Sequence, residues 1–519
     1  MNNQSSTELQ KFTGDVAWVV ISMVFTSLTG LVTLPALTRA FSAEIFGVWV
    51  QILVTVGLLT PILTLHLGTT MVRFLAGEDD KEKRRRVFST MLWPVVAFTC
   101  FVLLISLLLK QNLSILLFAD PKYSFFIPLT FLWVLTEALF LLSLSYLRAR
   151  GKIKMLSFIQ LALAIVKMGL IVTLAVTGYS LEWIIVCLII GQALFLTLVF
   201  GMIVNEIGIP QPCLQGLSGY LAFSTPMIST GALLWVINSS DRFFIIHLLN
   251  LSQAGIYSAS YTLASLVSLF FMPVSFVLFP TVSRFWEQKE LSKVRNYFEC
   301  STKLFLTLAI PATAGLYMVS QPLLGILTTP EFMVGGGLVL LIALGTVLLG
   351  IWQMNVYIIL LVGKTKWLPL MVGIAALTNA GINIVLIPKI GIMGAAISTI
   401  VSYFILSAIV TAWATRAINY RIDLKFLSKV VMATLLMTFC LRFIGIDSAL
   451  SIVLAVIAGA AIFGAGLLVL RAFSKQDTRL IKEILAGLNP RLWARKYHDR
   501  QNPPVSNEQE SNEEKDDKS

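Results

Sequence analysis

Charged residues are scarce in this chain of 519 residues, because Asp, Glu, Lys and Arg make up only 13% of it. A soluble protein has about 25%. Apolar residues make up 57%. This balance excludes a soluble globular protein, a disordered chain and a secreted disulfide scaffold, and it predicts a polytopic membrane protein.

Cysteine and histidine are also rare, with five and three residues. The number of cysteines is odd and no Cys-x-x-Cys spacing occurs, so we predict small core residues and no disulfide framework. With so few histidines we expect no metal site, and no motif indicates a cofactor. The chain has no Walker A pattern. The loops between its apolar runs reach only about 20 residues, which is short for a membrane glycosyltransferase, so we predict that the protein is not an enzyme.

Long apolar runs recur along the chain, and each can cross the ~30 Å hydrocarbon core of a bilayer. They predict 14 transmembrane helices near residues 15–37, 45–67, 88–109, 123–147, 155–177, 182–204, 218–240, 254–281, 302–320, 335–361, 367–388, 392–415, 427–445 and 449–470. The first run is too long for the apolar core of a signal peptide, and we interpret it as a span.

Basic residues lie mostly on one side of these predicted spans. Of the 39 Lys and Arg residues, 32 fall in the loops and ends on the side of the two termini, six fall on the other side and one lies within a span. Cytoplasmic loops carry the excess of Lys and Arg. The sequence therefore predicts a multi-pass protein of the cytoplasmic membrane with both termini in the cytoplasm, and the net charge of +12 gives no indication of nucleic-acid binding.

Two short ends flank the spans. Residues 1–14 form a polar cytoplasmic N-terminus. After the last span, residues 471–500 combine an apolar helical face with basic residues, which predicts an interfacial helix on the inner leaflet. Residues 501–519 are polar and acidic, and we expect them to be disordered.

The two halves of the chain resemble each other at a nearly constant shift. Residues 42–49 match 250–257 at a shift of 208, and Gly151–Lys154 match Gly363–Lys366 at a shift of 212. Six spans separate the matches, so the repeats are parallel. We therefore predict an all-α fold with two pseudo-symmetric six-helix lobes, 15–204 and 218–415, and with two peripheral helices in 427–470.

Several motifs at repeat-related positions resemble one known family. They are Arg39–Ser42 with Phe46–Trp49, Asp241-Arg242 with Ala254–Tyr257, and Gly363–Lys366 with Asn379, Asn383, Pro388 and Gly391–Ala396. Together they resemble the polysaccharide transporter (O-antigen or oligosaccharide flippase) family of the MOP exporter superfamily, over roughly residues 10–470. The resemblance implies a MATE-like fold that moves a polyprenyl-diphosphate-linked oligosaccharide across the cytoplasmic membrane for cell-surface polysaccharide biosynthesis.

This resemblance leaves alternatives open. A cation-coupled multidrug exporter of the same superfamily is the second interpretation, and a membrane glycosyltransferase or polymerase is the third. For a flippase, the expected partners are the lipid-linked oligosaccharide, membrane lipids, H⁺ or Na⁺ as a coupling ion, and polysaccharide polymerases or glycosyltransferases.

Two charges lie deep within predicted spans, where a charge costs about 2.5–3.5 kcal/mol on insertion scales. Glu137 lies 14 residues before Gly151 and Lys167 lies 16 after it, which places the two at similar depth on adjacent antiparallel helices. They form either a structural ion pair or a cavity site for the diphosphate or a coupling ion.

Four arginines near the ends of spans are candidates for the substrate path, because Arg binds phosphate in a bidentate manner. Arg73 and Arg284 lie on the predicted cytoplasmic side, where simple anchoring is the alternative. Arg39 and Arg242 lie on the predicted outer side, where Asp241 offers Arg242 a local partner. Pro61 and Pro273 interrupt equivalent spans and are candidate hinges for alternating access.

Overall fold

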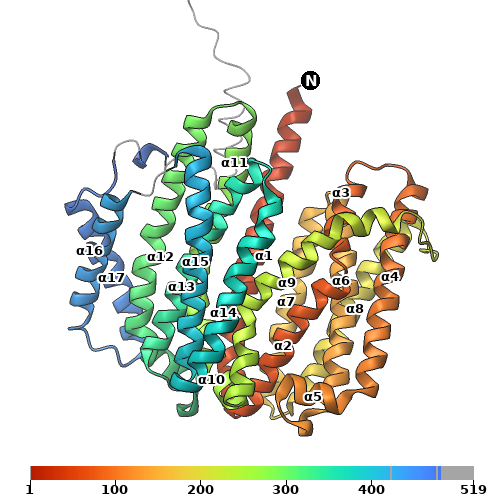
Figure 1. The fold of residues 1–519 in the computed structure, drawn as a ribbon, viewed down its shortest axis with the longest axis horizontal. Helices are drawn as coiled ribbons and strands as arrows, with labels where there is room; N and C mark the ends of the chain where they lie inside the picture. The colour runs from red at the N-terminus through yellow and green to blue at the C-terminus, as the bar shows by residue number, and fades with distance from the viewer. Residues whose placement is uncertain (1, 421–422, 475–476, 481–519) are drawn as a thin grey trace, which may run out of the picture.

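The computed structural model describes residues 2–420, 423–474 and 477–480, and every regular element in this part of the chain is helical. Figure 1 shows two helical bundles side by side, with α16 and α17 at the outer edge of one of them. The first bundle comprises α1 (Asn2–Ala40), α2 (Ala43–Leu63), α3 (Leu67–Leu75), α4 (Lys81–Leu108), α5 (Lys110–Phe118), α6 (Phe126–Ala149), α7 (Ile153–Val176) and α8 (Leu181–Ile207).

The second bundle follows a loop that ends at Gly216. It comprises α9 (Leu217–Leu248), α10 (Leu251–Ala264), η2 (Ser265–Phe270), α11 (Phe271–Glu287), α12 (Leu291–Leu327), α13 (Gly336–Leu361), α14 (Leu368–Ile390) and α15 (Ile392–Ile418), and α16 (Leu424–Leu441) and α17 (Ala449–Val469) then pack beside it. We call the end of the molecule with α3, α11 and Asp477–Leu480 the termini face, and the end where α2 and α10 begin the opposite face (Figure 1).

The membrane-spanning segments agree with the apolar runs of the sequence. Among the described residues, 12 helices are long and apolar enough to cross a membrane. The two remaining predicted spans coincide with α1 and with the broken segment α10–η2–α11. The all-helical, multi-pass fold expected from composition is therefore confirmed.

Equivalent turns in the two bundles have the same backbone structure. Gly151 and Gly363 follow α6 and α13 with φ of +66° and +73°, a conformation that glycine adopts without strain. In each turn the glycine N–H bonds three residues back, and the N–H of Lys152 or Lys364 bonds five residues back, at distances of 3.0–3.1 Å. The repeat identified in the sequence thus extends to the hydrogen bonds of the chain.

The two candidate hinges lie beside breaks in helical geometry. Pro61 is near the end of α2, and the chain then passes through Leu65 and His66 with φ of 52° and 50° before α3 begins. In the second bundle, the 3₁₀ segment η2 separates α10 from α11, and Pro273 is in the first turn of α11. Proline removes a backbone donor and favours such breaks.

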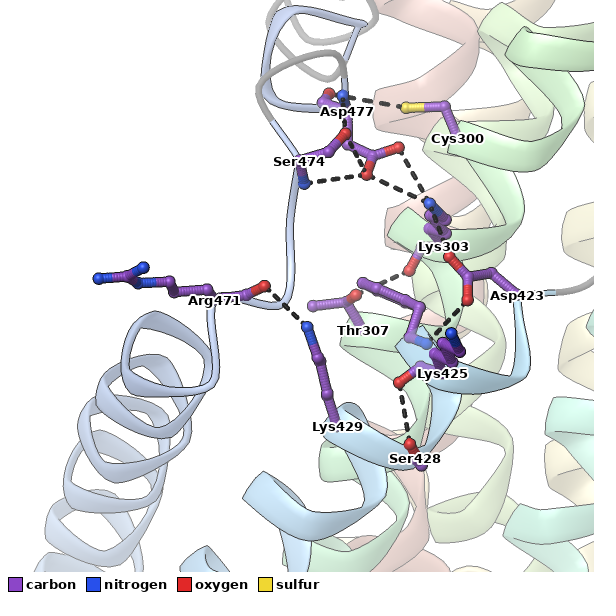
Figure 2. A network of polar contacts seen from close by, with 11 residues as sticks. Cys300, Lys303, Thr307, Asp423, Lys425, Ser428, Lys429, Arg471, Ser474 and Asp477 are labelled. Carbon is purple, nitrogen blue, oxygen red and sulfur yellow. Dashed lines mark hydrogen bonds and ion pairs between the residues drawn. The ribbon is translucent and has the colours of Figure 1, made fainter.

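Lys303 of α12 forms ion pairs with two residues that flank the peripheral helices α16 and α17 (Figure 2). Lys303 Nζ lies 3.2 Å from Asp423 Oδ2 and 3.1 Å from Asp477 Oδ1. Asp423 caps α16 by accepting the Phe426 N–H, and this bond together with Lys303 holds the pKa of Asp423 below its ordinary value despite the opposing effect of burial. Asp477 and Ser474 form a reciprocal capping box, with N–H to side-chain distances of 3.0 Å.

Most of the predicted interfacial helix, residues 481–500, and the whole predicted tail, residues 501–519, lie outside the described residues. Residues 477–480 are helical, at the expected start of that helix. The domain boundaries beyond residue 480 therefore remain predictions.

Candidate functional site

The two bundles meet on the opposite face through two glycines at repeat-related positions. A Cβ atom on Gly47 of α2 would lie 2.1 Å from the carbonyl oxygen of Leu251, and one on Gly255 of α10 would lie 2.3 Å from the carbonyl oxygen of Ala43. Both distances are far below van der Waals contact, so neither site accepts a side chain in this conformation. The shift of 208 residues relates Gly47 to Gly255 and Ala43 to Leu251, so the contact is reciprocal. We call these four residues the glycine contact.

Hydrogen bonds between the ends of α1 and α12 support the glycine contact. Arg39 Nη2 donates to the Ile326 carbonyl at 2.8 Å, and Thr38 Oγ1 lies 3.3 Å from the Leu327 carbonyl. Arg39, which the sequence predicts on the substrate path, thus binds the other bundle's backbone on the opposite face. Its side chain remains exposed.

The charged pair expected within the first bundle is present. Lys167 Nζ lies 3.4 Å from Glu137 Oε2, and each side chain keeps about a fifth of its surface exposed, 23% and 21%. Lys167 Nζ also lies 5.7 Å from the centre of the Trp133 ring, a cation–π distance. The ion-pair prediction is confirmed, whereas the contribution of the pair to transport stays a prediction.

The second bundle contains a different charged cluster. The Asp241 carboxylate accepts Arg242 Nη1 at 2.7 Å and the Tyr257 hydroxyl at 2.5 Å, and its side chain is completely buried. The Arg242 guanidinium lies 4.0 Å from the centre of the Tyr261 ring. Both oxygens of the carboxylate are therefore occupied, and the arginine charge is balanced inside the protein.

The position of Arg242 differs from the sequence prediction. A span over 218–240 would leave Arg242 at an outer end, but α9 continues to Leu248. The side chain consequently lies inside the bundle, with 7% of its surface exposed. The apolar residues Phe243–Ile246 extend the helix, and hydropathy alone placed the boundary too early.

An aromatic residue connects each charged cluster to the glycine contact. Trp49, two residues after Gly47, lies with its ring 5.9 Å from that of Trp133, which in turn lies beside Lys167. Tyr257, two residues after Gly255, donates its hydroxyl to Asp241. Sequence reasoning missed both aromatic links, although the shift of 208 residues that pairs Gly47 with Gly255 also pairs Trp49 with Tyr257.

Arg73 and Arg284 occupy equivalent positions on the termini face, in the last turns of α3 and α11. Both side chains are exposed. Arg73 lies 4.3 Å from the centre of the Phe223 ring and Arg284 lies 5.1 Å from that of Phe285. Within the described part of the chain neither guanidinium has an anionic partner, so both are available to an anionic ligand.

The Glu206 carboxylate forms ion pairs with three basic residues. The sequence indicated these three residues as signals of orientation in the membrane and not as a site. Glu206, at the end of α8, lies 2.6 Å from Arg84, 3.1 Å from Arg150 and 2.6 Å from Lys152. These residues come from α4 and from the turn between α6 and α7. The cluster connects the termini-face ends of four helices of the first bundle, α4, α6, α7 and α8.

An apolar groove of about 570 Å³ lies between α12 and the peripheral helices. Its lining comes from η2, α12, α16 and α17 and includes Phe270, Leu308, Met437 and Phe463. It contains no charged side chain. A groove of this composition suits a hydrocarbon chain and does not suit a sugar.

Comparisons with known proteins agree with this architecture. A family model described as "Polysaccharide biosynthesis protein" matches residues 36–334, more than half of the chain. The probable flippase AglR of Haloferax volcanii is 29% identical over 246 residues, 45% of this chain and 51% of the relative. The probable low-salt glycan biosynthesis flippase Agl15 of the same organism is 22% identical over 303 residues, 55% of this chain and 61% of the relative. The matches thus span about half to three fifths of these relatives.

Solved structures share the fold at low sequence identity. Lipid II flippase MurJ in an inward closed conformation superposes with a TM-score of 0.72 at 15% identity, covering 87% of this chain and 98% of that one. The MATE multidrug transporter DinF-BH superposes with a TM-score of 0.57 at 15% identity, covering 81% and 98%. The two bundles, the repeat and the matched region lead to one conclusion: this chain is a multi-pass membrane protein of the polysaccharide biosynthesis protein family, built on the fold of the MurJ and MATE transporters of the MOP superfamily.

Proposed function

We propose that this protein is a flippase that moves a polyprenyl-diphosphate-linked oligosaccharide from the cytoplasmic to the outer face of the membrane by alternating access. The observation that carries the proposal is the reciprocal glycine contact, at which α2 of the first bundle and α10 of the second approach each other closely on the opposite face. On the termini face, Arg73 and Arg284, which have no anionic partner among the described residues, supply the charge that a diphosphate requires.

The apolar groove and the family support the same substrate class. A diphosphate and sugar hydroxyls cannot cross ~30 Å of hydrocarbon without a polar route, whereas a polyprenyl chain can stay in apolar surroundings. The groove beside α12 offers such surroundings at the edge of the second bundle. AglR and Agl15 are both named as probable flippases.

A cation-coupled multidrug exporter is the second candidate, favoured by the likeness to DinF-BH. Coupling to H⁺ or Na⁺ uses a carboxylate that can exchange its cation. The two carboxylates deep in the described spans, Glu137 and Asp241, each already have a basic partner, Lys167 or Arg242. This arrangement supports the sugar-lipid substrate more than the drug substrate.

Reconstitution separates these two functions. The full chain is placed in liposomes that contain a fluorescent polyprenyl-diphosphate oligosaccharide, and a membrane-impermeant reductant reports how much label reaches the outer leaflet. We expect faster loss of fluorescence than in liposomes with an unrelated membrane protein. Export of a cationic dye without movement of the labelled lipid would establish the exporter instead.

Charge reversal at the termini face tests the proposed loading site. We expect Arg73→Glu and Arg284→Glu each to lower the initial rate of translocation by about tenfold or more, because a charge-assisted bond worth about 1.5–3 kcal/mol becomes a repulsion. Arg416→Glu is the matched control, since Arg416 is also an exposed arginine in the last turn of a helix that reaches this face. Equal losses in all three variants would indicate a general charge effect and not a site.

The orientation in the membrane is a separate proposal, based on the 32 of 39 basic residues on the side of the termini. It makes the termini face cytoplasmic. Reporter fusions after Ser519 and within residues 178–180, between α7 and α8, are expected to report opposite sides of the membrane. A cytoplasmic signal from the 178–180 loop would reverse the assignment of both faces.

A further inference from the structure

A pocket with both polar and apolar lining residues lies on the opposite face, between α12 and α16. It is separate from the interface between the two bundles. Its volume is about 700 Å³. The lining residues are Tyr317, Met318, Gln321, Pro322, Gly336, Leu435, Thr438, Phe439 and Arg442. No side chain of the glycine contact, of the Lys167 pair or of the Asp241 cluster contributes to it, so the pocket needs its own explanation.

Arg442 is the single charged residue in this lining. Its backbone N–H closes the last turn of α16 on the carbonyls of Thr438 and Phe439 at 3.2 and 3.3 Å, while its side chain is exposed. In the described part of the chain no ion pair or hydrogen bond involves its guanidinium. A cation at a helix C-terminus is favourable by itself, but that role does not require a pocket with an amide, a phenol and a hydroxyl around it.

The apolar part of the pocket continues onto the surface of α16. Phe439 and Leu435 line the pocket and keep 62% and 63% of their surface exposed, and Phe443 just beyond keeps 77%. The rings of Phe439 and Phe443 lie 5.2 Å apart. An arginine at the end of a membrane-spanning helix, next to a row of exposed apolar side chains, matches the structure of a phospholipid, which has a phosphate at the interface and acyl chains below it.

The floor of the pocket is formed by a close approach of α12 and α13. A Cβ atom on Gly336 would lie 2.8 Å from Ser320 Oγ and 3.3 Å from the Tyr317 ring. Tyr317 and Gln321 are one helical turn apart on α12, and Gln321 is exposed. The Tyr317 hydroxyl and the Gln321 amide therefore belong to the same pocket lining as Arg442, and both are hydrogen-bond donors.

We propose that this pocket binds the phosphate headgroup of an anionic glycerophospholipid from the bilayer, with Arg442 as its principal ligand. A bilayer lipid is favoured over the transported lipid because the pocket lies at the end of α16 on the opposite face (Figure 1), whereas Arg73 and Arg284, which we propose to load the diphosphate, lie on the termini face. The bound lipid fills the space between α16 and α12 and so connects the peripheral helices to the second bundle on this face, as Lys303 does on the termini face.

Lipid titration of the purified full-length protein tests this site. Detergent-solubilised protein is titrated with phosphatidylglycerol or with phosphatidylcholine, and bound lipid is counted by native mass spectrometry. We expect tighter binding of phosphatidylglycerol, about tenfold weaker binding of it in Arg442→Gln, and partial recovery in Arg442→Lys, which keeps the charge but loses the bidentate geometry. Lys110→Gln, which removes another exposed cation at the start of α5, is expected to bind as the wild type does.

A photoreactive phosphatidylglycerol tests where the lipid binds and whether the bound lipid is a bilayer lipid or the transported lipid. We expect cross-linked peptides from residues 317–322 and 435–442, and loss of this cross-link in Arg442→Gln. Equal binding of the two lipids by the wild type, or unchanged phosphatidylglycerol binding in Arg442→Gln, would overturn the site. Displacement of the cross-link by polyprenyl phosphate at far lower concentration than by phosphatidylglycerol would overturn the choice of a bilayer lipid.

Discussion

Gly47→Val is expected to abolish translocation while leaving the protein folded in the membrane. A valine Cβ would meet the Leu251 carbonyl oxygen at 2.1 Å, and this atom belongs to the backbone and cannot swing aside. Overpacking costs about 1–3 kcal/mol, which would lower the population of the closed contact by roughly 5- to 150-fold relative to an open one. The variant would be confined to conformations in which the bundles are apart on this face.

Gly57→Val is the matched control for this change. Gly57 is on the same helix, α2, but nothing lies within 4 Å of its Cβ position. Both variants replace a helical glycine by the same β-branched residue, so their intrinsic effects on the helix are similar. Only the first disturbs the contact between the bundles.

Distances between spin labels at Lys110 and Glu331 would follow the separation of the bundles directly, because both residues are exposed and lie on different bundles. We expect longer distances in Gly47→Val and in Gly255→Val than in the wild type, and unchanged distances in Gly57→Val. Wild-type distances together with wild-type transport in Gly47→Val would show that the glycine contact plays no part in the transport cycle.

Lys167→Ala is expected to eliminate transport as well, for an electrostatic reason. Removing the lysine leaves Glu137 within the membrane without its partner at 3.4 Å. Breaking a buried pair costs about 3–5 kcal/mol, and we expect the lower end of this range because both side chains keep about a fifth of their surface exposed, 23% and 21%. Lys167→Arg keeps the charge and should retain part of the activity.

The double variant Lys167→Ala/Glu137→Ala distinguishes a structural pair from a functional one. Removal of both partners relieves the unpaired charge, so membrane abundance and thermal stability should return toward the wild type. If the lysine acts on the substrate, translocation should stay low at normal abundance. Full recovery of translocation in the double variant would show that the pair only holds α6 and α7 together.

The aromatic links give these two predictions a common structural basis. Trp49 and Tyr257 each follow a glycine of the contact by two residues and each reach toward a charged cluster, the first through Trp133 and the second directly. We expect a change in one charged cluster to alter the glycine contact through these side chains. Double-variant cycles between Lys167 and Gly47 would measure this coupling.

Local sequence patterns were sufficient for much of the fold. The spans follow from hydropathy, because hydrocarbon accepts only long apolar helices. The turns at Gly151 and Gly363 follow from a repeat of the same four-residue pattern, and the pairing of Glu137 with Lys167 follows from counting a fixed rise per residue away from one turn. Each of these inferences uses residues that are close in the chain or related by a constant shift.

The sequence by itself determined the membrane class, the spans, the parallel repeat and the pair of charges within the first bundle. Only the tertiary structure decided which distant residues meet. It placed Gly47 against the Leu251 carbonyl oxygen and the Tyr257 hydroxyl on the Asp241 carboxylate. It also brought three basic residues to Glu206, and it placed Lys303 between Asp423 and Asp477. The physical reason is that a membrane helix is apolar on the face toward lipid and on the face toward its neighbours. Hydrophobic periodicity therefore does not reveal how each helix is rotated, and contacts between distant segments depend on that rotation.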